Sequence, residues 1–358
     1  MRVAASNLLS ASKTKVLGRI SATGASSVVL LLVAVGFPFV YSDFFVFQAN
    51  QVLVYGIAIL GLVLLTGLTG TISIGHGAIF GIGAYATALG MHDLHLPYPI
   101  ALLFALGVGA IAGVLIGIPA LRLRGAYLAL VTLALTLVFP PLVLRFESLT
   151  GGAAGYSVPA IDAPQWSDLT LSQWLYFVTL VIGIVAIVVM QNIKRSARGR
   201  ALRAIERSEP LAVAVGINVS RERITVFVIS SAYAGLAGGL YALVSGAVAP
   251  DAFTFVLSSS LLVGAVVGGI TSPIGALIGG VLVAVVPTVT ATLPHGLPEY
   301  IYAIAVLLAV YLRPEGLASV PAGLIEFGRS LRARQTASAT VARRQNHPES
   351  VPVKEGQQ

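Results

Sequence analysis

Residues 194–223 read KRSARGRALRAIERSEPLAVAVGINVSRER, and this stretch decides how the rest of the chain is arranged. It is the most polar internal part of the sequence and is dense in Arg and Lys. Long apolar runs flank it, from Leu175 to Met190 and from Ile224 to Val248. A basic loop between two apolar runs of membrane length is typical of the cytoplasmic side of a membrane protein.

A short helix is expected inside this loop, over residues 199–215, because apolar side chains recur there at helical spacing. Pro210 would break or kink it. The helix is too short and too charged to span a bilayer, so its apolar face either lies on the membrane or enters a groove on a partner protein. We favour the partner. The face would comprise Ala201, Leu202, Ile205, Leu211, Ala212 and Val215.

The composition predicts an all-α integral membrane protein. The chain is 56% hydrophobic and 10% charged, with a mean hydropathy of +0.91, whereas soluble domains carry roughly 25% charged residues. Its apolar runs are continuous rather than alternating, which argues against barrel strands. The absence of cysteine excludes a disulfide framework and a thiol nucleophile. The net charge of +8 reflects basic cytoplasmic loops, and no nucleic-acid partner is expected.

The apolar runs predict a polytopic bundle of about ten transmembrane helices. The third run is rich in glycine, which indicates close helix contacts or a partly unwound segment. The fourth carries Gly109, Gly113 and Gly117 on one stripe, a spacing that favours tight helix packing. The predicted spans are residues 26–41, 48–65, 66–90, 98–121, 127–144, 173–191, 224–244, 253–268, 274–289 and 300–312.

The distribution of basic residues predicts that both termini lie in the cytoplasm. With ten spans in that orientation, all 22 Lys and Arg residues except Arg145 fall on the cytoplasmic side. The expected organisation is a cytoplasmic tail over 1–25, a permease domain over 26–318 with a cytoplasmic loop at 194–223, and a cytoplasmic tail over 319–358. The end of that tail, from about residue 332, is expected to be disordered.

The chain shows no energy source of its own. It contains no GxxxxGK[ST] phosphate loop. The predicted spans hold almost no ionisable side chain apart from His76, which argues against an ion-driven pump. No paired carboxylates, metal cluster or nucleophile–base set appears in them either, so an enzyme is not expected. These features favour a pore-forming subunit driven by a separate ATPase, with a channel or secondary transporter as the alternative from another class.

Seven stretches, taken in order, resemble the branched-chain amino acid permease family of bacterial ABC importers, specifically the LivM type. The resemblance runs from about residue 50 to residue 317, and the ordered set is far more specific than any one piece. The stretches are GLTGTISIGHGAIFGIGAYATALG (67–90), LRLRGAYLALVTLA (121–134), LTGGAAG (149–155), GRALRAIERSEPLAVAVGINV (199–219), FVISSAYAGLAGGLYAL (227–243), VVGGITSPIGALIGG (266–280) and RPEGL (313–317).

The resemblance implies one of two homologous permeases in the bacterial inner membrane, with two cytoplasmic ABC ATPases below and a periplasmic substrate-binding protein above. It implies branched-chain or related hydrophobic amino acids as cargo; urea, short amides or aromatic acids are the alternative within the same architecture. No cofactor is expected on this chain, and ATP-Mg would bind the ATPases. Residues 199–216 correspond to the coupling segment that enters the ATPase groove. The expected coupling residues are Arg203, Ala204, Glu206, Glu209, Leu211, Ala212 and Gly216.

The chain departs from the family pattern in two places. The family usually has Ile-Arg-Glu-Asn-Glu at positions 205–209 and Ala-Ala-Glu-Ala at 211–214, where this chain has IERSE and LAVA. The acid missing at Val213 changes the expected docking contacts. In the glycine-rich run, Thr71 replaces a common Gln and Ile79 a common aromatic residue, which bears on the substrate.

Four residues of the glycine-rich run are candidates for the translocation pathway: Ser73, Gly75, His76 and Tyr85. A histidine within a span is a functional candidate. The alternative is that His76 only bonds to a neighbouring carbonyl while the glycines permit close packing. Likewise, Arg203 and Glu206 could simply pair on a solvated helix face. The C-terminal Arg343, Arg344 and Lys354 are expected near anionic membrane lipid.

Overall fold

A computed structural model describes residues 32–120, 126–159, 161, 163–164, 168–290, 304 and 311 of the chain. Helices dominate these residues, and the only strands among them, β1 (Tyr156–Ser157) and β2 (Ala247–Val248), form one antiparallel pair. The helices are α2 (Asp43–Thr69), α3 (His76–His92), α4 (Tyr98–Ala120), α5 (Ala126–Arg145), α6 (Glu147–Thr150), α7 (Leu171–Arg195), α8 (Ala197–Arg207), α9 (Glu209–Ala214), α10 (Val219–Ser245), α11 (Phe255–Gly268) and α12 (Pro273–Thr290), with the 3₁₀ turns η1 (Gly152–Ala154) and η2 (Pro250–Phe253). Residues 32–40 are also helical.

The fold confirms a helical membrane protein. Five described helices, α2, α4, α7, α10 and α12, are long and apolar enough to cross a membrane. A sixth span arises if the segments Ala129–Arg145 and Glu147–Ala154, which meet at a 92° bend, count as one. Each predicted run between residues 48 and 289 contains a helix, although residues 70–75 within the run 66–90 are not helical. The total of ten and the side on which the termini lie stay predictions. The predicted tenth span and both tails lie almost wholly outside the described residues.

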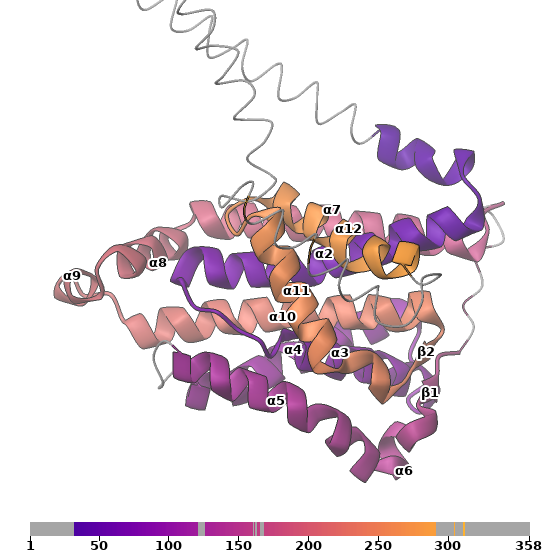
Figure 1. Ribbon diagram of the computed structural model, residues 1–358, viewed down its shortest axis with the longest axis horizontal. Coiled ribbons are helices and arrows are strands. Elements are labelled where there is room, and N and C mark those ends of the chain that lie inside the picture. The colour runs from indigo at the N-terminus through magenta and orange to yellow at the C-terminus, as the bar shows by residue number, and fades with distance from the viewer. Residues whose placement is uncertain are drawn as a thin grey trace, which may run out of the picture.

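The two ends of the bundle carry different structures. Figure 1 shows α2 and α10 running side by side, with α11 crossing the bundle obliquely. The pair α8 and α9 projects from one end, and β1, β2 and α6 lie at the opposite end. By the distribution of basic residues the α8–α9 end is cytoplasmic, and "inner" and "outer" below follow that prediction.

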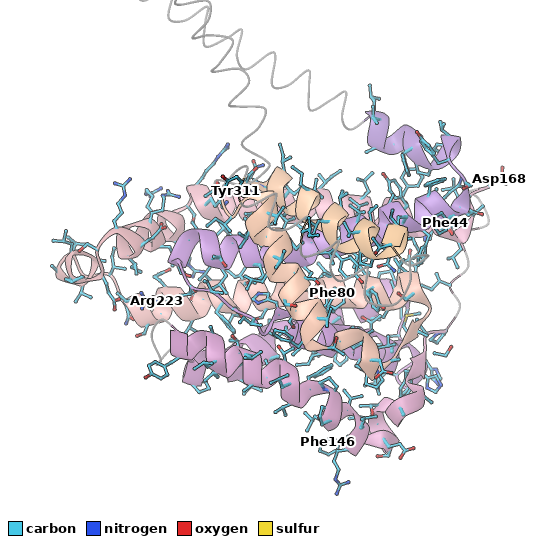
Figure 2. The ribbon with its side chains drawn as sticks, viewed as in Figure 1. Phe44, Phe80, Phe146, Asp168, Arg223 and Tyr311 are labelled. Carbon is cyan, nitrogen blue, oxygen red and sulfur yellow. The ribbon has the colours of Figure 1, made fainter. Side chains whose placement is uncertain are left out.

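Glycine lets α3, α4 and α10 approach one another closely. A Cβ on Gly83 of α3 would overlap the backbone of Gly235 in α10, and a Cβ on Gly109 of α4 would lie 2.8 Å from the carbonyl of Ser231. Helices in a membrane associate mainly through such packing, because the lipid is as apolar as their side chains. Large rings fill the remaining space: Phe80, fully buried, lies in the middle of the bundle (Figure 2). The predicted small-residue stripe on α4 is therefore the face that meets α10.

Gly83→Ala is expected to destabilise the fold by about 1–3 kcal/mol, because the added methyl group has to push α3 away from α10. Gly107→Ala is the matched control, since nothing lies within 4 Å of the Cβ it would add. The control should be neutral or slightly stabilising, as alanine favours the helix. Thermal unfolding midpoints in detergent compare the two variants. Equal midpoints would show that the α3–α10 contact is not closely packed.

Candidate functional site

The chain between α2 and α3 is a non-helical segment that runs back into the bundle. α2 ends at Gly70, which has the left-handed φ of 65° and donates its N–H to the carbonyl of Thr66. Residues 70–75 are irregular, with a bend at Ile74 and a turn at Gly75, and α3 begins only at His76, which is fully buried. Unpaired backbone groups are costly in a membrane and need partners within the protein. The glycine-rich run therefore contains the unwound segment as well as the close contacts expected of it.

Hydroxyl side chains of α5 hold the backbone of this segment. The N–H of Ile74 donates to Oγ1 of Thr132 at 3.1 Å, and the hydroxyl of Thr136 donates to the carbonyl of Ile74 at 3.0 Å. Thr136 also lies 3.3 Å from the hydroxyl of Ser258 in α11. Gly75 fits against this wall because a Cβ there would lie 3.0 Å from the Thr132 carbonyl. The segment thus has one polar wall built from α5 and α11.

His76 joins the unwound segment to α10. Its Nε2 lies 2.6 Å from Oγ of Ser230, and its Nδ1 lies 3.1 Å from Oγ of Ser73. Ser230 donates its own proton to the carbonyl of Gly61 at 2.6 Å, so its oxygen is left to accept the Nε2 proton. Nδ1 then accepts from Ser73. The imidazole is neutral in this arrangement, and both of its nitrogens are used.

Tyr85 lies apart from the other three pathway candidates. It follows His76 by two and a half turns of α3, a rise of about 13 Å. Its ring packs against Phe139 and Phe253, with ring centroids 6.3 Å and 5.9 Å away. Ser73, Gly75 and His76 are brought together in one polar cluster, whereas Tyr85 belongs to an aromatic cluster nearer the outer end. All four are buried.

The cytoplasmic loop folds into two helices rather than one. Ser196 caps α8, its Oγ accepting from the N–H of Gly199, and the helix ends before Ser208. Pro210 lies in the first turn of α9, where proline is tolerated. The break therefore falls just before the expected proline.

The apolar face of α8 is turned inward, contrary to our expectation that it enters a partner. Leu202 is 2% exposed and Ile205 3% exposed, and both belong to the main hydrophobic core. Ala212 of α9, also only 2% exposed, is buried with them. The expected continuous face is thus divided, because Leu211 and Val215 lie on the other side of the break and are exposed.

The exposed surface of α9 is apolar. Leu211, Val213 and Val215 have exposed fractions of 69%, 58% and 74%. They belong to α9 and the residue after it, and α9 forms the tip of the α8–α9 projection, beyond the bulk of the bundle (Figure 1). Leu211 and Val215 lie one helical turn apart, Val213 lies on another side of α9, and exposed apolar side chains such as these are suited to contact with another protein.

An ion pair fastens α9 to α10. The guanidinium of Arg223 lies 3.1 Å from the carboxylate of Glu209, and both side chains are partly buried. Figure 2 places Arg223 at the inner end of the bundle, beside α8 and α9. Ser230 follows Arg223 by two helical turns, so both side chains project from about the same side of α10. One helix therefore contacts both the cytoplasmic projection and the histidine cluster.

The remaining expected coupling residues lie in α8 or just after α9, near the ion pair between Glu209 and Arg223 in the sequence. Arg203 donates to the carbonyl of Lys194 at 2.9 Å, and no ion pair joins it to Glu206 among the described residues. Ala204 is half-buried and Glu206 is exposed. Gly216 has a φ of 83°, which favours glycine and ends α9 in a tight turn. The solvated Arg–Glu pair is thus not seen.

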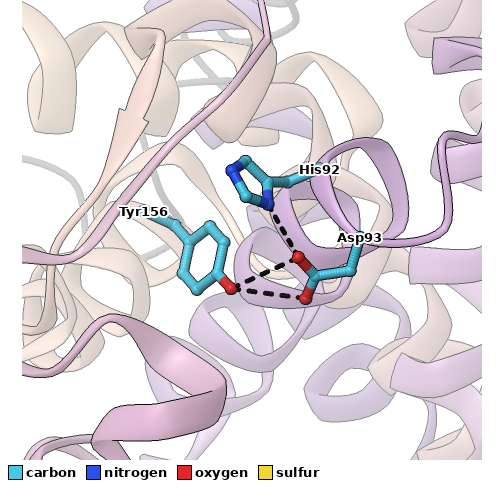
Figure 3. A network of polar contacts seen from close by, with 3 residues as sticks. All are labelled: His92, Asp93 and Tyr156. Atoms are coloured by element: carbon cyan, nitrogen blue, oxygen red, sulfur yellow. Dashed lines mark hydrogen bonds and ion pairs between the residues drawn. The ribbon is translucent and has the colours of Figure 1, made fainter.

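Another polar cluster, separate from the histidine cluster and the Glu209–Arg223 ion pair, lies at the outer end of the bundle (Figure 3). Nδ1 of His92 lies 2.7 Å from Oδ1 of Asp93, and the hydroxyl of Tyr156 donates to Oδ2 of Asp93 at 3.3 Å. The hydrogen bond from His92, aided by the one from Tyr156, lowers the pKa of the Asp93 carboxyl. This cluster ties the end of α3 to β1 in the loop that follows LTGGAAG. The motif therefore forms part of an ordered outer corner.

Sequence reasoning missed the hydroxyl partners of the cluster. Ser230, Thr132, Thr136 and Ser258 lie inside apolar runs, and their spacing carries no motif that singles them out. The only hint in the sequence is that these serines and threonines lie within predicted spans, where hydroxyl groups commonly form hydrogen bonds between helices. No group of three or more potential metal ligands occurs among the described residues.

The family model and the related proteins that match this chain all point to the same family. Residues 44–312 match the family model described as the permease component of branched-chain amino acid transport systems. The chain is 35% identical over 263 residues to the high-affinity branched-chain amino acid transport permease LivM of Salmonella typhimurium, covering 66% of this chain and 61% of that protein. It is 34% identical over 265 residues to LivM of Escherichia coli, covering 67% and 62%.

A second kind of relative is the LivH permease of the same transport system in Escherichia coli, 27% identical over 216 residues, covering 55% of this chain and 68% of that protein. The match spans about three fifths of the length of the two LivM proteins. No solved structure matches the chain.

Ser230→Ala is expected to cost about 1–3 kcal/mol of stability, because it leaves His76 and the Gly61 carbonyl without their buried partner. The neighbouring Ser231→Ala is the control. Ser231 is equally buried, but its hydroxyl has no hydrogen-bond partner among the described residues, so its loss should be neutral or favourable. Unfolding midpoints in detergent measure both. A Ser231 variant as unstable as the Ser230 variant would contradict the assigned network.

Asp93→Asn is expected to lower stability at neutral pH and to have less effect in acid. A carboxyl with a lowered pKa contributes stability above its usual range near 3.9, and that contribution is lost as the pH falls through the lowered value. The difference in unfolding midpoint between wild type and variant should therefore shrink as the pH falls below the usual carboxyl range. Asp168→Asn, in an exposed loop, is the control. A difference independent of pH would contradict the contact in Figure 3.

Proposed function

The chain belongs to the permease component family of branched-chain amino acid transport systems, and from this membership we propose that it is the membrane subunit of an ABC importer. It is a multi-pass protein of the bacterial inner membrane. The cargo we propose is a branched-chain or related hydrophobic amino acid, moved inward by ATP hydrolysis on separate subunits. The proposed partners are a second, homologous permease, two ABC ATPases holding ATP-Mg, and a periplasmic binding protein.

The exposed apolar tip of α9 is the observation that carries the proposal. A loop this basic would be expected to present charge to water, yet Leu211, Val213 and Val215 are exposed together. Burying such side chains in a partner groove contributes roughly 25 cal/mol per Å² of apolar surface. We assign the contact with the ATPase to this tip and to Glu206 and Gly216 beside it.

Four of the expected coupling residues would support the contact surface rather than form it. They are Arg203, Ala204, Glu209 and Ala212. Ala212 and the α8 core fix α9 against the bundle, and Glu209 transmits its displacement to α10 through Arg223. A helix is stiff along its axis, so movement at Arg223 also shifts Ser230, about 10 Å further on. Ser230 bonds directly to His76. This continuous set of contacts supports α10 as the element that links ATPase movement to the unwound segment.

Ser73, Gly75 and His76 are proposed to border the translocation pathway when the bundle opens. Their backbone is non-helical or at a helix start, and unwound backbone inside a membrane protein commonly lines a site or cavity. The enclosed cluster described above would be the closed state. Tyr85, further out among aromatic rings, would then border the outer half of the pathway. Thr71 and Ile79, which depart from the family pattern, lie in the same region and would alter the selectivity for the solute.

Leu211→Asp is expected to abolish ATP-driven uptake while leaving the assembled protein folded, because Leu211 is exposed and makes little contact within the chain. Ala212→Asp is less informative, since a buried charge would also disrupt α8 and α9. The control is Leu94→Asp, at an equally exposed apolar residue on the outer side. ATP-dependent solute uptake by vesicles holding the full assembly is the measurement. Normal uptake by the Leu211 variant would remove α9 from the coupling contact.

The same vesicles test the cargo. Uptake of radiolabelled leucine that requires both ATP and the binding protein is the expected result. Uptake of urea, a short amide or an aromatic acid instead would retain the architecture and change the cargo. Transport of leucine by the purified chain alone, driven by an ion gradient, would contradict the proposal entirely.

A further inference from the structure

A long groove runs inward from the outer end of the bundle between α4 and α7, with α10 as its floor. Its volume is about 730 Å³, within the range of roughly 300–1,000 Å³ usual for small-molecule sites. We propose that this groove binds one acyl chain of a phospholipid from the outer leaflet. The proposal is independent of which solute the protein carries.

The lining of the groove is apolar apart from one tryptophan and two tyrosine side chains, and it contains no charged residue. The walls are formed by residues such as Leu102 of α4 and Val181 and Val185 of α7, and the floor by Ala232 and Leu236 of α10. The floor also contains Tyr233, whose hydroxyl donates to the carbonyl of Ala186 at 2.7 Å. That hydroxyl is therefore already used inside the protein. A hydrocarbon chain satisfies such a surface, whereas an amino acid would leave its charges unpaired.

The dimensions of the groove fit a lipid tail. Along α7 the lining extends from Trp174 to Val189, a rise of about 22 Å, and along α4 from Tyr98 to Leu106, about 12 Å. One leaflet contributes roughly 15 Å of hydrocarbon, half of a bilayer core of about 30 Å.

Two aromatic residues mark the mouth. Tyr98 is the first residue of α4, and Trp174 lies in the first turn of α7. Tyrosine and tryptophan gather at the membrane–water interface, where their rings lie at the level of the lipid headgroups. Both line the groove, so it opens at headgroup level and extends along α7 past the middle of the membrane. A phospholipid entering from the outer leaflet would keep its headgroup in water.

The test is photocrosslinking of the intact assembly in vesicles of phosphatidylethanolamine and phosphatidylglycerol that contain a phospholipid with a diazirine on its acyl chain. Peptide mapping by mass spectrometry gives the adduct positions. Adducts at Val181 and Val185 should exceed those at Val188, which is equally exposed on α7 but does not line the groove, by severalfold. Equal labelling of both faces would mean bulk lipid only and would overturn the proposal.

Filling the groove gives the matched comparison. Ala232→Phe should reduce the Val185 adduct to the level of Val188, while Val188→Phe should leave it unchanged. Val181→Phe, at an exposed wall position, is the second filling variant if the first does not assemble, as judged by size-exclusion chromatography. Unchanged labelling in the filled variants would contradict the site. A crosslink from the groove to a partner polypeptide or to residues preceding 32 would also overturn it, since another occupant would then cover the groove.

Discussion

The backbone between α2 and α3 sets the constraint on which the rest of this structure depends. Residues 70–75 give up helical hydrogen bonds inside a bundle surrounded by lipid, and each group freed must find a partner in the protein. Thr132 and Thr136 supply both partners of Ile74. This requires α5 to lie beside the segment at one register, and it explains why hydroxyl groups interrupt an otherwise apolar helix. The unwound segment and its neighbouring helices are therefore specified together.

Helix α10 occupies a central position in this arrangement. Its glycines pack on α3 and α4, its Ser230 bonds His76, and its Arg223 pairs with Glu209. Close packing and short hydrogen bonds leave little freedom for α10 to move independently of α3. A displacement at the inner end is then shared by the helices around the histidine cluster. The coupling we propose through α9 would need no long relay of side chains, because one helix contacts both sites.

Much of the fold follows from the sequence, because lipid requires continuous apolar helices. The predicted runs from 98–121 and 127–144 to 274–289 lie within a few residues of α4, α5 and α12. The partners of those helices could not be predicted: Ser230 meets His76 across 154 residues, and no spacing in the sequence encodes that contact. The position of the unwound segment is also a tertiary property. Glycine indicated that the helix was weak, but the hydroxyls of α5 decide where it ends.

The cytoplasmic loop shows why helical spacing alone misassigned a surface. Leu202, Ile205 and Leu211 are all apolar, and one periodic face through them is the simplest reading. The break at Ser208 rotates α9 relative to α8, so the first two complete the core and the third is exposed. The departure at Val213 then acquires a physical meaning. Where the resemblance leads us to expect an acid, this chain exposes an apolar side chain, so the docking contact that we propose for this tip would rest on shape and hydrophobic contact rather than on charge pairing.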